Sequence, residues 1–194
     1  MADQEIETFY PKSQSEWRAW LQQYHQSRDS IWLVYYKVST GIPSLTWSEA
    51  VDEALCFGWI DSMKKTIDKD RYRQYFSKRK PTSIWSKINK EKVVDLIQNK
   101  QMTQAGMDCI TIAKQNGSWS FLDDIDNLIV PDDLQSAFDK YKNSFTFYDK
   151  QSNSIKKQLL YWVKTAKRAA TRNKRINEIA QLAAEESLPK PITS

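Results

Sequence analysis

Residues 46–77 read TWSEAVDEALCFGWIDSMKKTIDKDRYRQYFS, and their pattern changes from that of a helix to that of strands. This stretch opens with a capping box, in which Thr46 is the N-cap and Glu49 the third helical residue. Apolar side chains then recur at helical spacing as far as Cys56. From Trp59 onwards the pattern changes to short aromatic and β-branched runs on either side of a turn-like segment. A helix followed by a β-hairpin is therefore predicted.

Three strands are expected in this part of the chain. Residues 59–67 and 72–77 form the two arms of the hairpin, and residues 68–71 form its turn. Residues 31–38 are rich in aromatic and β-branched side chains and are bounded by Asp, Ser and Gly, so they predict a further strand. The pattern predicts a small three-stranded antiparallel sheet in the N-terminal third, which helices must cover.

The rest of the chain has the apolar spacing of helices and residues that can cap them. We expect helices that start after Ser13 or Ser15, after Thr82 or Ser83, at Thr103 and at Pro131, a longer one over residues 152–169, and a last one around Ile176 and Ala183. Only four Gly and six Pro occur, which fits helices joined by short connections. The predicted fold class is α+β and helix-dominated.

We expect a single domain over residues 1–194. Within it, a stretch at 118–131 that is rich in both acidic and apolar residues separates two subregions. These are residues 1–117, with the sheet and its covering helices, and residues 131–187, with basic C-terminal helices.

The composition also bears on the compartment. No run of about 18 apolar residues is present, so no transmembrane segment is expected. The N-terminus is acidic and polar and lacks the regions of a signal peptide. Cys56 and Cys109 have no partner motif, which is typical of reduced thiols. The expected location is the cytoplasm.

Positive charge is unevenly distributed along a chain whose net charge is +5. Residues 150–177 contain nine basic side chains and no acidic one, and a second basic concentration runs over 64–92. A solvated helix face explains such a run, and so does a surface for an anionic ligand, an acidic protein, a nucleic acid or a membrane surface. The sequence leaves both explanations open.

The motifs of common enzyme classes are missing. The single histidine, His25, and the lack of paired cysteines predict no metal site, and four glycines cannot supply the usual phosphate-binding loops. We therefore expect a non-enzymatic protein without a cofactor. The alternative is an enzyme that uses Asp61 or Glu53 as an acid or base.

One long string carries a family resemblance: Glu-Ala-Val-Asp-Glu-Ala-Leu-Cys-Phe-Gly-Trp-Ile-Asp, residues 49–61. Further blocks at residues 83–89, 102–106 and 162–176 extend it. With these blocks the chain resembles the YdeI/OmpD-associated, or bacteriocin-protection, family of bacteria. Ser62 departs from the residue typical of the family at its position.

The resemblance implies a role in tolerance of bacteriocins or cationic peptides and an indirect association with the envelope or a porin. It implies no reaction and no cofactor. The matching blocks contain polar and aromatic residues that we expect to form a binding groove: Trp59, Asp61, Arg79, Trp85, Asn89, Lys167, Thr171, Arg172 and Arg175. In such a groove Arg and Trp would grip an anionic group. The alternative is a polar network that locks the hairpin to the helices.

Overall fold

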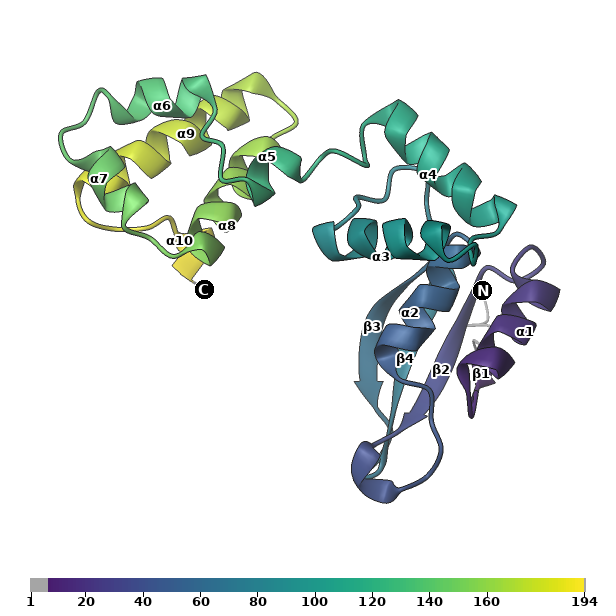
Figure 1. The fold of residues 1–194 in the computed structure, drawn as a ribbon. Helices are drawn as coiled ribbons and strands as arrows, with labels where there is room; N and C mark the ends of the chain where they lie inside the picture. Colours follow the sequence, from purple (N-terminus) through teal and green to yellow (C-terminus); the bar gives the residue numbers. More distant parts are fainter. Residues whose placement is uncertain (1–6, 194) are drawn as a thin grey trace, which may run out of the picture. The chain divides into compact units, whose positions relative to one another are not determined.

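The computed structural model describes residues 7–193, and the chain forms two compact units. The first unit ends at Ser120 and the second begins at Phe121 (Figure 1). Whether the two units act as one domain, with the subregions 1–117 and 131–187, stays a prediction.

The first unit contains a four-stranded sheet in the order β1-β2-β4-β3. Its strands are β1 (Thr8–Phe9), β2 (Ser30–Tyr36), β3 (Trp59–Thr66) and β4 (Arg71–Lys78). Strand β4 pairs antiparallel with both β2 and β3, whereas β1 pairs parallel with β2. The α+β class is confirmed, but the prediction of three strands is wrong. A strand of two residues is too short to show an alternating pattern, and parallel pairing leaves no hairpin turn to reveal it.

The helices of the first unit are α1 (Gln14–Tyr24), α2 (Trp47–Cys56), α3 (Lys87–Gln98) and α4 (Gln104–Asn116), with a short 3-10 turn, η1 (Val38–Thr40). The capping box at the start of α2 is confirmed. The predicted start of α3 is wrong, because its N-cap is Ser86 rather than Thr82 or Ser83. Trp85 is fully buried, and its backbone N–H bonds to the carbonyl of Ser118, which holds this residue outside the helix.

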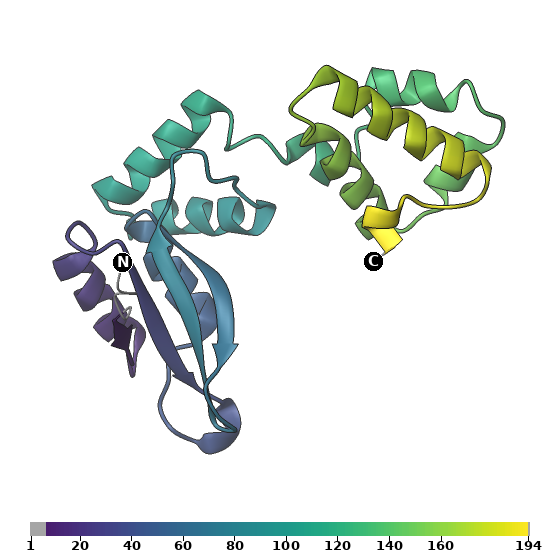
Figure 2. The same cartoon turned by 180° about the vertical axis from the view of Figure 1, so that it is seen from behind.

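The core of the first unit lies between α2, α1 and one face of the sheet (Figure 1). Indole and phenyl rings fill much of it, since Trp17 packs against Trp20 and Phe76. Figure 2 shows the opposite face of the sheet, which no helix among residues 7–120 covers. This second face is called the open face below.

The second unit is helical, with α5 (Asp123–Asp126), α6 (Asp132–Phe138), α7 (Ser144–Asp149), α8 (Asn153–Lys164), α9 (Ala169–Ala184) and α10 (Lys190–Thr193). The predicted helix over 152–169 is too long, because α8 ends at Lys164. Arg175 of α9 donates to the carbonyl of Trp162 at 2.5 Å, and the hydroxyl of Thr165 donates to the backbone carbonyl of Tyr161. These carbonyls near the end of α8 are therefore satisfied. In the described part of the chain no helix is both long and apolar enough to cross a membrane.

Candidate functional site

The residues expected to form the groove belong to both units. The first unit holds Trp59, Asp61, Arg79, Trp85 and Asn89, and the second holds Lys167, Thr171, Arg172 and Arg175. A common groove of these two sets stays a prediction. Within the first unit Arg79 and Trp85 touch each other, and the contacts of the other candidates are with residues outside the expected set.

Arg79 lies buried just beyond the end of β4, with 8% of its surface exposed. Its guanidinium carbon is 3.7 Å from the centre of the Trp85 ring, and its Nη2 donates to the carbonyl of Ile84 at 2.9 Å. Its Nε and Nη1 have no hydrogen-bond partner among the described residues. Burial lowers the pKa of Arg79 to about 10. These contacts are those of a side chain that holds the loop before α3 in place.

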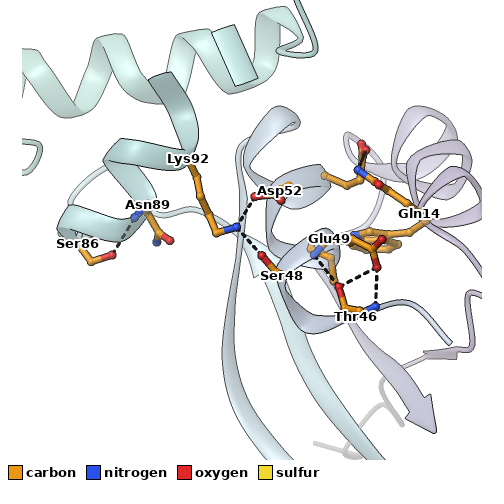
Figure 3. Close-up of polar contacts among 11 residues, drawn as sticks. Gln14, Thr46, Ser48, Glu49, Asp52, Ser86, Asn89 and Lys92 are labelled. Carbon is orange, nitrogen blue, oxygen red and sulfur yellow. Dashed lines mark hydrogen bonds and ion pairs between the residues drawn. The ribbon is translucent and has the colours of Figure 1, made fainter. Parts of the chain in front are cut away.

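The other candidates of the first unit also have local partners. The Asp61 carboxylate accepts from the indole of Trp47 at 2.8 Å and from the amide of Gln74 at 3.0 Å. Trp59 is buried and donates to the carbonyl of His25 at 3.3 Å. The backbone N–H of Asn89 bonds to the hydroxyl of Ser86, the N-cap of α3 (Figure 3). Of the five candidates in this unit, only Arg79 and Trp85 form a direct pair in these contacts.

The acidic side chains of α2 are engaged one by one. Glu49 accepts from Thr46, and Lys92 bonds to both Asp52 and Ser48 (Figure 3). Glu53 has 3% of its surface exposed and accepts from Arg18 at 2.7 Å and from Gln14 at 2.8 Å. Each carboxylate therefore has a stabilising partner. An acid–base role for Glu53 or Asp61 stays a prediction.

In the second unit, acidic residues from other segments pair with much of the basic run. The ion pairs join Lys156 to Asp149, Lys157 to Asp126, Lys164 to Asp124, and Arg172 to Asp133. Four of the nine basic residues of 150–177 are therefore matched. The local sequence could not show this, because Asp124 and Asp126 come from the acidic stretch at 118–131 and Asp133 lies just after it. Lys150, Lys167, Arg168 and Lys174 are exposed.

Arg172 and Lys164 line a hollow of about 390 Å³, whose apolar side includes Leu160 and Val163. The Arg172 guanidinium bonds to both carboxylate oxygens of Asp133, at 2.7 and 2.9 Å, and to the carbonyl of Val163. Its donors are thus directed at protein atoms. This geometry is that of a structural ion pair beside a small hollow.

The ion pair of Arg172 with Asp133 predicts a pH dependence of stability. Hydrogen bonds from Arg172 hold the pKa of the Asp133 carboxyl below its usual range, so the unfolded chain takes up a proton first as the pH falls. The stabilisation is fully present above the usual pKa of about 4 and is lost as the pH falls through the lowered pKa. Asp133→Asn is expected to lower the free energy of unfolding by about 1 kcal/mol at neutral pH and by less in acid. Urea unfolding at several pH values measures this, and an equal loss at every pH would contradict it.

A second group of cationic and aromatic residues gathers on the open face. The register of the strands places side chains of this face in three successive rows across the sheet: Thr8, Trp32 and Tyr75; Val34, Arg73 and Lys65; Tyr36 and Arg71. These eight residues define the open-face cluster. None of them is acidic.

Two cations of the open-face cluster lie over one indole ring. The guanidinium carbon of Arg73 is 4.5 Å from the centre of the Trp32 ring, and Lys65 Nζ is 5.5 Å from it. Tyr75 meets the same ring edge-on at 5.1 Å, which leaves Trp32 with 6% of its surface exposed. Arg71 instead pairs with Asp68 at 2.7 Å. The cations of the cluster without an acidic partner in the described contacts are thus Arg73 and Lys65.

The open-face cluster is not evident from the sequence. The alternation of Arg73, Tyr75 and Ser77 with Gln74 and Phe76 was visible and could have assigned the first three to one face. Their position beside Trp32 depends on the pairing of β2 with β4, two strands far apart in the sequence. Only the register shows that cations and aromatic rings from three strands share a face.

The geometry is that of an α+β protein with a sheet covered by helices on one face, followed along the chain by a helical unit. Residues 9–109 match the model of a family described as a domain of unknown function (DUF8412). This match covers more than half of the chain, and the chain belongs to that family.

Residues 127–186 match a second model, described as Bacteriocin-protection, YdeI or OmpD-Associated. The resemblance inferred from the sequence is confirmed for these residues, which lie in the second unit. The string at 49–61, which suggested it first, lies in the part matched by the domain of unknown function. Comparison with curated proteins and with solved structures gave no match.

Proposed function

We propose that this chain is a non-enzymatic binding protein of the cytoplasm that holds an anionic partner on the open-face cluster. Its role in bacteriocin protection is proposed from the family description matched by residues 127–186. An indirect connection to the envelope or to a porin is proposed on the same basis.

The observation that carries the proposal is the pair of cations over Trp32. Arg73 and Lys65 lie on a face that no helix among residues 7–120 covers, and no acidic side chain occurs in the open-face cluster. Two neighbouring positive charges repel each other, and an anion placed between them relieves the repulsion. Contact with the indole holds both side chains close to the sheet, so less conformational entropy is lost when a partner binds.

The open face supports the proposal better than the groove expected from the sequence. Arg79 is buried under its contacts with Trp85 and Ile84, and Arg172 is bonded to Asp133. A partner would have to displace these contacts first. Arg73 and Lys65 require no such exchange of ion pairs.

Retention on heparin-agarose tests the proposal, because heparin is a polyanion. The double variant Lys65→Gln, Arg73→Gln is expected to elute at clearly lower salt than the unmodified chain. The control is Lys150→Gln, Lys174→Gln, which removes the same charge from exposed positions of the second unit. We expect the control to elute close to the unmodified chain. Equal elution of both double variants would mean that net charge alone controls retention, and the proposal would fail.

A further inference from the structure

We infer that the anionic partner of the open-face cluster is a single-stranded nucleic acid. This inference rests on the proposed function and names the chemical class of the partner. It depends on where the aromatic rings lie relative to the two cations.

The rows of the cluster differ in character along the strands. Tyr75 belongs to the first row, Arg73 and Lys65 to the second, and Tyr36 to the third, where its neighbour Arg71 is paired with Asp68. Side chains two residues apart on one strand are separated by about 6.7 Å, so the outer rows are about 13 Å apart. A phenol ring therefore lies on each side of a cationic row.

Both phenol rings are accessible in part. Tyr75 and Tyr36 are half-buried, unlike Trp32, which Arg73 and Lys65 cover. Tyr36 is held by an edge contact with Tyr10 at 5.1 Å, and Tyr75 by its contact with Trp32. A nucleic-acid base can stack on the exposed side of rings fixed in this way, with little further loss of side-chain conformational entropy.

This arrangement matches the repeating chemistry of a single strand. Its phosphates need cations and its unpaired bases need flat apolar rings, and the cluster offers both within one face. A duplex keeps its base faces stacked inside, so it could use only the cations. An acidic peptide likewise has charge for Arg73 and Lys65 but no planar bases for the two tyrosines.

Fluorescence anisotropy of the full chain with a labelled oligothymidylate of about ten nucleotides tests the inference. The comparison probes are a duplex of the same length and a polyglutamate peptide of similar charge. We expect the single strand to bind tighter than either probe. Its log–log salt slope should be reduced by about 1.4 in Lys65→Gln, Arg73→Gln, because about 0.7 is lost per phosphate contact.

The tyrosines provide the discriminating variant. Tyr36→Val, Tyr75→Val removes both rings, keeps the charge and retains residues suited to strands. It is expected to weaken binding of the single strand by about tenfold or more, with little effect on heparin retention. The matched control is Tyr161→Val, an exposed tyrosine of the second unit, which should bind as the unmodified chain does. Circular dichroism and the melting temperature establish that each variant is folded.

The outcomes separate this inference from the proposed function. If heparin retention depends on Lys65 and Arg73 but loss of the tyrosines leaves oligothymidylate binding unchanged, the nucleic-acid inference is overturned and anion binding stands. The same holds if polyglutamate or the duplex binds as tightly as the single strand. If the cation variant alters neither retention nor binding, both the inference and the proposed function fail.

Discussion

Replacing Gly106 with alanine is expected to destabilise the first unit by about 2 kcal/mol or more, although this change stabilises most helices. Gly106 lies in α4, where that helix crosses the end of α2. A Cβ atom added here would lie 2.5 Å from the carbonyl oxygen of Cys56 and 2.7 Å from that of Leu55. Both contacts are with backbone, so relief requires the two helices to move apart.

Urea unfolding monitored by tryptophan fluorescence measures the effect, because the core that would be disturbed contains four tryptophans, Trp17, Trp20, Trp59 and Trp85. Gly117→Ala is a useful control, since a Cβ at Gly117 meets nothing within 4 Å. Its positive φ of 81° still imposes a cost of about 1 kcal/mol. A gain in stability for Gly106→Ala would show that α2 and α4 do not approach each other as described.

Arg79→Ala is expected to lower the free energy of unfolding by about 3 kcal/mol. The substitution removes the stacking on Trp85 and the hydrogen bond to the carbonyl of Ile84, and it leaves a space beside a buried indole. Arg79→Met should cost much less, since it keeps most of the volume and removes a buried charge with two unpaired donors.

Thermal melting of the two variants distinguishes a structural role of Arg79 from a binding role. We expect both to remain bound to heparin-agarose as the unmodified chain does, because Arg79 is not part of the open-face cluster. The opposite result, an unchanged melting temperature with loss of retention, would restore Arg79 to the binding site.

Local signals in the sequence predicted much of the fold of the first unit. The capping box at Thr46 and Glu49 and the hairpin turn are encoded by neighbouring residues, and the structure contains both. The strand β1 could not be predicted, because its parallel pairing with β2 joins segments without a local signal. The start of α3 has no local signal either, since the hydrogen bond between Trp85 and Ser118 is tertiary.

The candidate site was harder to predict than the fold. A basic run such as 150–177 indicates a charged surface only if no acid folds against it, and Asp124, Asp126 and Asp133 do so here. Conversely, Lys65 and Arg73 are only two of several charged residues in a hairpin that contains both acidic and basic side chains. Their importance depends on Trp32, to which they are brought by the strand register.

The most direct test of the proposed function is to map where a polyanion contacts the chain. Backbone amide shifts of the ¹⁵N-labelled full chain would be followed while a heparin oligosaccharide is added. If the partner binds the open face, the largest changes occur in β2, β4 and β3 at positions such as Trp32, Arg73 and Lys65. Changes confined to residues 127–186, or no changes at all, would contradict the proposed function.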